Sequence, residues 1–361
     1  MSLSATNAHE TQPSASASRV TDVMSPLVAD MLEEYGSTTR EALARYLPSG
    51  YPTRYLYELL ADYPRRGGKM MRPSICIATA RAFGASPSEA VRSAVAIELL
   101  HNAMLIHDDI QDSSAMRRGA PTLHMLHGVP LAINAGDALF LLSLRPLLDN
   151  AGLVGGMLGL RILREMETVA WHSLEGQAIE LGWIRDNVLE LTEADYLDMV
   201  LKKTCWLATI HPSRIGALIG SRGAADLEPF IRFGFFLGAA FQIQDDLLNI
   251  AADGRYGKEL NGDLFEGKRS LLLIHAYRHC SPIERARLSR LFRRPRDKRK
   301  PQDVEWVLAL MAELGSVDYV RQFAHALAGA ALHEFDLTYG RLPQSRDKAF
   351  LHGLAAWIFE R

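Results

Sequence analysis

The chain has 361 residues, 48% of them hydrophobic, and its 40 basic residues nearly balance its 42 acidic ones. This length provides material for one large domain or two ordinary ones with a sizeable core. A formal net charge of −2 leaves no excess of basic residues for a broad basic surface, so we expect no nucleic-acid partner.

Residues 1–20 are mostly small and polar, and they lack the basic start and apolar centre of a secretory signal. We therefore expect a disordered N-terminal tail. No Gly/Ser-rich or Pro-rich linker divides the sequence after it. Residues 21–361 are accordingly expected to form a single domain.

Helix-start signals recur along the chain. Ser86 is followed by Pro87 and Glu89, and SPIERARL at 281–288 repeats the arrangement. A serine cap, a proline in the first turn and a glutamate three residues after the cap favour helix initiation. Apolar residues recur at helical spacing, as in VEWVLALMAEL at 304–314, and we find no alternating strand or hairpin signal. The predicted fold class is all-α.

Cysteine usage and hydropathy bear on location. The three cysteines lie far apart and form no Cys-x-x-Cys pair, so we expect reduced thiols in a cytoplasmic protein. The longest apolar run, FGFFLGAAF at 233–241, leads directly to Gln242 and Asp245. It falls short of the ~18 residues that a membrane helix needs, so we predict no membrane span.

Three aspartates follow the mostly apolar run IELLHNAMLI at 97–106. If one helix continues to Asp112, then Asp108 and Asp112 lie one turn apart on the same face, and Asp109 is about 100° to the side. Unpaired carboxylates at this spacing repel one another, and an oxygen-only cluster suits Mg²⁺. The alternative is a solvated helix end, but the apolar run indicates a central helix.

A second acidic pair, Asp245 and Asp246, follows another apolar segment in FQIQDDLLN at 241–249. Two acidic patches that each end a buried helix can face one another across a cavity. Together they can hold several metal ions on a polyanion.

Four basic patches accompany the acidic residues. Arginine binds phosphate oxygens bidentately, and lysine acts as a point charge. One such patch is more often a solvated surface, but metals together with several cations indicate one or two diphosphates. The candidates are Lys69, Arg72, Arg117, Arg118, Lys203, Lys258 and Lys268, with Asp263 between the last two. A further basic run, RRPRDKRKPQD at 293–303, is expected to be a surface loop; a membrane-surface or partner contact is the alternative.

Several motifs together resemble the trans-isoprenyl diphosphate synthases over residues 65–270, with a weaker echo at 342–361. In order they are GGKMMRP, HNAMLIHDDIQDSSAMRRGAPTLH, INAGDALF, GQAIEL, KKT, FQIQDDLLN and GKELNGDLFEGK. The resemblance implies a single-domain helical bundle with a central cavity, assembled as a homodimer. It also implies a Mg²⁺-dependent prenyltransferase that joins isopentenyl diphosphate head-to-tail to an allylic diphosphate.

The resemblance assigns the site residues as well. Three Mg²⁺ ions would be held by Asp108, Asp112 and Asp245, with Asp109, Asp246 and Asp263 supporting them directly or through water. The allylic diphosphate would contact Arg117, Lys203 and Lys258, with Thr204, Gln242 and Lys268 close by. These three cations and the first three aspartates would form the catalytic group. Isopentenyl diphosphate would lie against Lys69, Arg72, His101 and Arg118.

Two positions depart from the family pattern. The second motif has Asn249 where an aspartate is usual, which weakens attraction for the third metal. GQAIEL places Glu180 where the family often has aspartate. We expect both departures to tune activity rather than abolish it.

Product length depends on the residues just before the first motif. Family members that make the fifteen-carbon product tend to carry an aromatic plug there, whereas this chain has Ala103 and the flexible Met104. We favour the twenty-carbon geranylgeranyl diphosphate, with a cavity floor from residues such as Phe140 or Trp171. Farnesyl and twenty-five-carbon or longer products remain open.

Three other functions share part of this pattern. A terpene cyclase shares the first motif but needs a different second metal motif, and it would leave Lys69, Arg72 and Arg118 without a second diphosphate. A metal phosphohydrolase is suggested by adjacent His107 and Asp108, but it leaves the second aspartate pair unexplained. A non-catalytic partner subunit usually lacks one acidic motif, whereas this chain has both.

Overall fold

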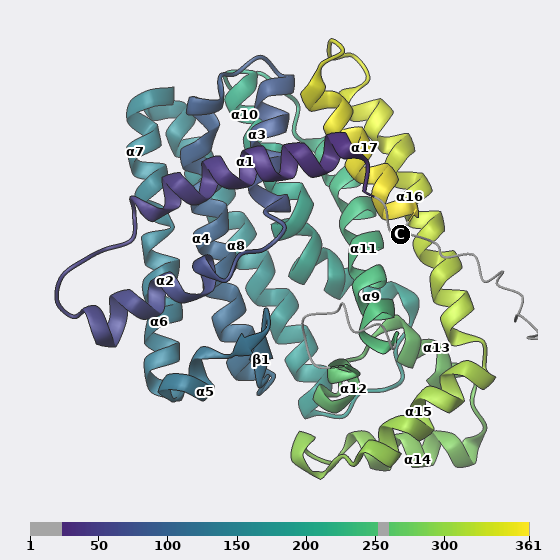
Figure 1. The fold of residues 1–361 in the computed structure, drawn as a ribbon. Helices are drawn as coiled ribbons and strands as arrows, with labels where there is room; N and C mark the ends of the chain where they lie inside the picture. Colours follow the sequence, from purple (N-terminus) through teal and green to yellow (C-terminus); the bar gives the residue numbers. More distant parts are fainter. Residues whose placement is uncertain (1–23, 252–259, 361) are drawn as a thin grey trace, which may run out of the picture.

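The computed structural model describes residues 24–251 and 260–360, so the expected tail at 1–20 lies outside the described part. The predicted all-α class is confirmed (Figure 1). The α-helices are α1 (Pro26–Ala44), α2 (Glu58–Arg65), α3 (Met71–Ala82), α4 (Pro87–Gln111), α5 (Leu123–His127), α6 (Val129–Leu142), α7 (Leu144–Val154), α8 (Gly156–Arg185), α9 (Glu193–Val200), α10 (His211–Gly220), α11 (Glu228–Ile250), α12 (Gly262–Glu266), α13 (Leu271–His279), α14 (Pro282–Phe292), α15 (Pro301–Glu313), α16 (Ser316–Tyr339) and α17 (Arg346–Glu360). Two π-type helices, η1 (Thr53–Tyr57) and η2 (Leu201–Ile210), and a 3₁₀ turn, η3 (Arg296–Lys298), complete the helical elements.

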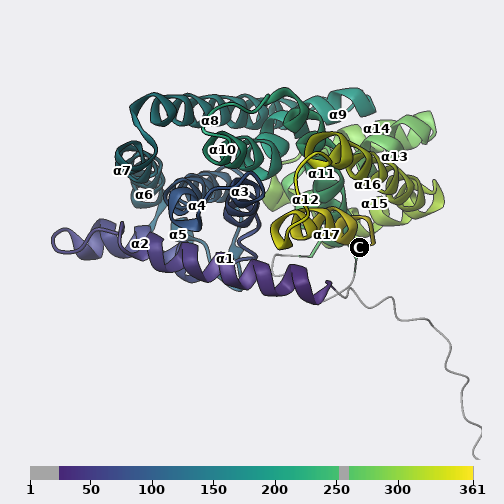
Figure 2. The same cartoon turned by 90° about the horizontal axis from the view of Figure 1, so that it is seen from above.

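Helix α4 is the central element, as its apolar sequence predicted. Ser86 and Glu89 form the expected capping box, with Pro87 as the first helical residue. The helix is buried around much of its circumference and packs against α3, α6 and α7. Its C-terminal end lies toward the middle of the molecule (Figures 1 and 2).

Two hydrophobic clusters hold the helices around α4. The larger joins α3, α4, α8, η2, α10, α11 and α16, and the smaller joins α1, α2, α4 and α6. Helix α11 packs closely against both η2 and α16, while η2 also contacts α8. The C-terminal ends of α4 and α11 therefore reach one region bordered by α8 and η2.

A short hairpin corrects the expectation of no strand pairing. Strand β1 (Met116–Arg117) pairs antiparallel with β2 (Ala120–Pro121), and residues 118 and 119 form its turn with φ values of 53° and 76°. Strands of two residues are too short to produce the alternating pattern that predicts a sheet. The hairpin fixes two adjacent arginines, Arg117 and Arg118, beside the end of α4.

The sequence predicted no membrane span. Within the described residues, the stretch Val129–Val154, which comprises α6 and α7, is long and apolar enough to cross a membrane by length and composition alone, which does not by itself show a span. Part of it packs in the core through Ala132, Ala135, Leu139 and Leu147, while other apolar side chains on it are exposed. The three cysteines, Cys76, Cys205 and Cys280, are free, as expected, and all three are buried.

Candidate active site

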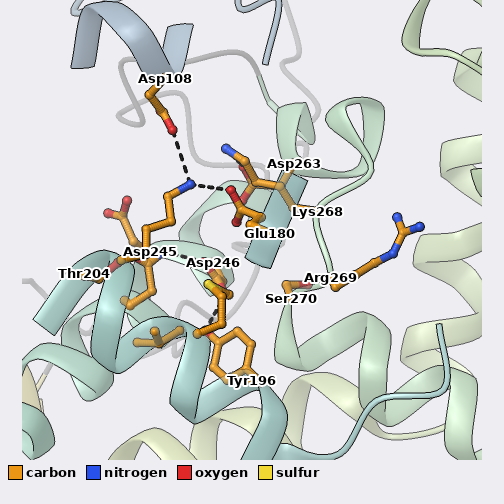
Figure 3. A pocket seen from close by; sticks show the side chains of 14 residues that line it. Asp108, Glu180, Tyr196, Thr204, Asp245, Asp246, Asp263, Lys268, Arg269 and Ser270 are labelled. Carbon is orange, nitrogen blue, oxygen red and sulfur yellow. Dashed lines mark hydrogen bonds and ion pairs between the residues drawn. The ribbon is translucent and has the colours of Figure 1, made fainter. Parts of the chain in front are cut away.

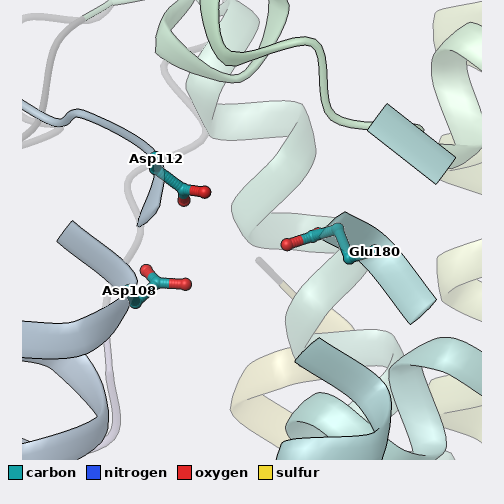
Figure 4. Close-up of side chains that lie close together, drawn as sticks. All are labelled: Asp108, Asp112 and Glu180. Atoms are coloured by element: carbon teal, nitrogen blue, oxygen red, sulfur yellow. The ribbon is translucent and has the colours of Figure 1, made fainter. Parts of the chain in front are cut away.

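The carboxyl end of α4 carries the first acidic motif. Asp108 and Asp112 lie one turn apart there, as predicted. Glu180 of α8 faces them, and one carboxylate oxygen from each residue lies within 4.8 Å of the others (Figure 4). Burial and the charge on Asp108 raise the pKa of Asp112 to about 7. Three oxygen donors at this spacing can hold a hard divalent cation, which would relieve their repulsion.

Asp109 points to a different set of partners. It is 1% exposed, and its oxygens accept hydrogen bonds from Arg117 Nε at 2.9 and 3.1 Å and from the Tyr63 hydroxyl at 2.6 Å. Burial and the Asp109 charge raise the pKa of Tyr63, which keeps the hydroxyl protonated as a donor. Arg117 Nη2 also lies 3.4 Å from Asp108 Oδ2. Asp109 therefore orients Arg117 toward the three-carboxylate group.

The second acidic motif ends α11 across the same region. Asp245 lines the cavity described below, whereas Asp246 is buried. Asp246 accepts a hydrogen bond at 2.8 Å from the Tyr196 hydroxyl (Figure 3) and another at 2.8 Å from Gln242 Nε2. Burial, followed by the charge on Asp263, raises the pKa of Asp246 to about 7. The two adjacent aspartates thus have different environments.

Asn249, the departure in this motif, holds the short helix α12. Its Oδ1 accepts a hydrogen bond from the Asp263 backbone N–H at 3.3 Å, and its carbonyl accepts one from Asn261 at 2.9 Å. Asp263 borders the same pocket as Asp245 and Asp246. An amide at position 249 therefore positions a further carboxylate without adding a negative charge.

Two lysines lie among these carboxylates. Lys203 Nζ is 3.2 Å from Asp108 Oδ1 and also contacts Glu180. Lys268 Nζ is 2.8 Å from Asp112 Oδ2. Burial opposes the charge on Lys203, but Asp108 and Glu180 outweigh it, so its pKa lies above the ordinary lysine value. The ammonium groups offset the buried negative charge.

Close backbone packing sets the position of Lys203. A Cβ atom at Gly176 of α8 would lie only 2.2 Å from the Lys203 backbone nitrogen. The glycine therefore allows α8 and η2 to approach closely. Thr204, the next residue of η2, donates to Gln242 Oε1 at 3.0 Å, which joins η2 to α11.

A second cationic group surrounds Glu98, on the same helix as the first acidic motif. The pKa of Arg72 falls to about 10 through burial, and its Nε has no hydrogen-bond partner among the described residues. Burial and the Arg72 charge lower the pKa of His101 to about 4, so the ring is neutral at pH 7. His101 Nδ1 lies 3.5 Å from Glu98 Oε1, and Arg118 donates to the Tyr63 carbonyl at 3.0 Å.

A cavity of about 670 Å³ connects the two charged groups. Asp108, Asp245 and Lys203 line one part, and Arg72, His101 and Arg118 line another. Apolar side chains line the remainder: Ala103, Met104, Phe140, Leu174, Leu207 and Phe241. The predicted central cavity is therefore present. Phe140 borders it as expected, whereas Trp171 is 64% exposed on α8.

Most of the site residues predicted from the sequence lie at this cavity or at the adjoining pocket, which Asp246, Asp263 and Lys268 line. Lys69 also lines it, with its Nζ 5.0 Å from the centre of the Trp357 ring. Lys258 lies outside the described residues. Sequence reasoning did not assign roles to Glu98 and Glu180 as partners. The Glu98 contact could have been predicted from its position, since Glu98 precedes His101 by about one helical turn.

Glu180→Gln tests the three-carboxylate group. Because the substitution removes one of three clustered charges, we expect Mg²⁺-dependent binding of inorganic diphosphate to weaken about tenfold in isothermal titration calorimetry. Glu175→Gln on the same helix is the matched control, since Glu175 pairs with Lys202 at 3.1 Å and lies outside the group. Equal affinity in both variants would remove Glu180 from the metal site.

Comparison with known proteins identifies the family. The polyprenyl synthetase profile matches residues 53–311. A geranylgeranyl pyrophosphate synthase from Geoglobus acetivorans is 31% identical over 94% of this chain and 99% of its own, and an octaprenyl diphosphate synthase from Escherichia coli is 32% identical over 82% and 86%. The crystal structure of geranylgeranyl pyrophosphate synthetase from Pyrococcus horikoshii superposes with a TM-score of 0.81 at 31% identity, over 93% of this chain and 98% of that one. The chain therefore belongs to the polyprenyl synthetase family and is a prenyltransferase.

Proposed function

We propose that this enzyme condenses isopentenyl diphosphate head-to-tail with an allylic diphosphate, in the presence of Mg²⁺, to form mainly geranylgeranyl diphosphate. The observation that carries the proposal is one cavity with three parts. It has a carboxylate group with paired lysines, a separate cationic group and an apolar extension. Two diphosphates and one hydrocarbon chain match these three environments.

The donor set fits Mg²⁺. Asp108, Asp112 and Asp245 would hold the ions, with Glu180 beside the first motif and Asp263 beside the second. All of these side chains supply oxygen ligands. The raised pKa of Asp112 shows that burial and Asp108 disfavour its negative charge, which a bound cation would stabilise. Bound Mg²⁺ would stabilise negative charge on the departing diphosphate.

The protein's own cations would assist at the same end of the cavity. Lys203 and Arg117 can donate hydrogen bonds to the allylic diphosphate as its C–O bond breaks and the electron pair moves to the diphosphate oxygen. The apolar lining would keep water from the resulting carbocation. The double bond of isopentenyl diphosphate then attacks that carbon, and loss of a proton, to the released diphosphate, restores an alkene.

The second cationic group would hold isopentenyl diphosphate. Arg72 and Arg118 supply positive charge, and neutral His101 can donate a hydrogen bond without adding to their repulsion. The buried Glu98 carboxylate offsets the positive charges of both guanidinium groups. This separation keeps the two diphosphates apart while their hydrocarbon ends meet.

The apolar part of the cavity supports a product longer than fifteen carbons. Met104 lines the cavity one turn before Asp108, and neither it nor Ala103 is an aromatic plug. Phe140 of α6 also lines the cavity. Relatives are named for geranylgeranyl, geranylfarnesyl and octaprenyl products, so the family name alone leaves the length open.

We also propose a homodimer formed through α6, α7 and α8. Large apolar side chains are exposed on all three helices, including Leu141 (69%), Leu148 (62%) and Met157 (77%). These helices lie along neighbouring edges of the molecule in Figure 2. Burial of this apolar surface against a second copy would be favourable.

Product analysis tests the reaction. We expect incubation with Mg²⁺, labelled isopentenyl diphosphate and five-, ten- or fifteen-carbon allylic diphosphates to give, after dephosphorylation, a twenty-carbon alcohol on chromatography. A fifteen-carbon product would retain the reaction but contradict the assigned length. No incorporation by folded protein that binds Mg²⁺ and diphosphate would favour a non-catalytic subunit or a cyclase.

Met104→Phe tests the passage of the growing chain. Because a phenyl ring at this position would obstruct the lining, we expect the main product to shorten from twenty to fifteen carbons in the same assay. Met104→Leu, which conserves volume, should keep the longer product. An unchanged product in the phenylalanine variant would place the hydrocarbon elsewhere.

Leu148→Asp tests the subunit contact. A charge in a buried apolar interface is costly, so we expect the variant to elute as a monomer in size-exclusion chromatography with light scattering, whereas the wild type elutes as a dimer. Ile283→Asp is the control, because Ile283 is 81% exposed on α14. A dimer that persists in the Leu148 variant would exclude this face.

A further inference from the structure

Most residues of the basic segment 293–303 are exposed, as predicted, but Arg296 is partly buried and Arg299 is buried. We propose that Arg296 of this segment is a positioning residue for the diphosphate end of the active site, acting through Glu266 and the backbone of Asp112. The role in catalysis rests on the function proposed above. The contacts themselves are independent of it.

Arg296 connects two elements that carry site residues. Its Nη1 donates to the Asp112 carbonyl at 3.2 Å and to Glu266 Oε1 at 2.8 Å. The side chain is only 23% exposed. One guanidinium therefore joins the end of α4 to the end of α12. In the sequence, α12 follows α4 by more than 150 residues, and Arg296 follows Glu266 by a further 30.

Glu266 is the centre of this connection. Its Oε1 also accepts from Ser114 Oγ at 3.0 Å, and its Oε2 lies 2.8 Å from Lys268 Nζ. Lys268 in turn lies 2.8 Å from Asp112 Oδ2. Arg296, Glu266, Lys268 and Asp112 thus form a closed ring of contacts.

The ring is anchored from the side of the basic segment. Arg299 is buried and donates to the Phe265 carbonyl at 2.5 Å and the Phe292 carbonyl at 3.0 Å. Its guanidinium also lies 5.4 Å from the Phe292 ring centre. The segment therefore holds α12 at two points, through Arg296 and Arg299.

The alternation of basic and acidic groups in this ring explains how Arg296 affects the position of Lys268. With Arg296 present, the Glu266 carboxylate is shared between a guanidinium and an ammonium group. Without Arg296, Lys268 is the one remaining basic group in this ring of four and is drawn toward Glu266, away from Asp112. Asp112 would also lose a restraint on its backbone carbonyl. Both changes would disturb the residues proposed to receive the metal-bound diphosphate.

The experiment compares Arg296→Gln, Arg296→Lys and a matched control, Arg294→Gln. Arg294 belongs to the same segment but pairs with Asp303 at 3.1 Å, and its side chain is 49% exposed. The readouts are the thermal unfolding midpoint, calorimetric affinity for inorganic diphosphate with Mg²⁺, kcat, and KM for isopentenyl diphosphate. The binding readout does not require turnover.

We expect Arg296→Gln to lower both the diphosphate affinity and kcat about tenfold, as loss of a charge-assisted hydrogen bond implies. KM for isopentenyl diphosphate should change less than about twofold, because its proposed site surrounds Glu98 instead. Arg296→Lys should recover part of the loss by retaining the charge, and Arg294→Gln should match the wild type.

Glu266→Gln completes a double-mutant cycle with Arg296→Gln. If Arg296 acts through Glu266, the two losses in diphosphate affinity will combine less than multiplicatively. Wild-type affinity in folded Arg296→Gln, or fully multiplicative losses, would overturn the proposal. If Arg296→Gln does not fold, Arg296→Lys decides by the same comparison. If the wild type binds diphosphate but shows no condensation, the proposed function is rejected. The diphosphate affinities of the variants would still test the role of Arg296.

Discussion

Buried like charge is the constraint on which the site depends. Asp108, Asp112 and Glu180 place three carboxylates within 4.8 Å, and such a group is costly unless cations offset it. Lys203 and Lys268 supply that charge within the protein. Each lysine comes from a different element, so the electrostatic requirement also fixes the relative positions of α4, η2 and the chain after α12. Carboxylates arranged in this way could exchange an ammonium contact for a metal ion, as proposed above.

The same requirement separates two adjacent arginines. Arg117 lies in strand β1 and pairs with Asp109, whereas Arg118 is in the turn with a positive φ and donates to the Tyr63 carbonyl. Tyr63 touches both arrangements, since its hydroxyl binds Asp109. A two-residue hairpin thereby directs one arginine to the carboxylate group and the next to the group around Glu98. The two proposed diphosphate positions would thus be distinguished by a single turn of chain.

Local features of this arrangement could be predicted from the sequence, because they depend on residues within one or two helical turns. The capping box follows from the spacing of Ser86 and Glu89, and the shared face of Asp108 and Asp112 follows from helical periodicity. The expected cavity followed from resemblance to a family. Long-range partners could not be predicted in this way. Nothing in a run of arginines distinguishes Arg296, which reaches Glu266, from Arg294, which pairs with Asp303. Selection between them is made by the packing of α14 and the segment after it.

Asn249 shows how a departure from a motif can be consistent with the same electrostatic constraint. Asp246, three residues earlier, already has a pKa raised to about 7 by burial and by Asp263. A carboxylate at position 249 would add charge beside this pair, whereas the amide oxygen still accepts from the Asp263 backbone. The amide therefore preserves the attachment of α12, which carries Asp263 and Glu266, and reduces the repulsion that must be offset when no cation is bound. Position 249 therefore contributes to the second acidic motif chiefly through the placement of α12.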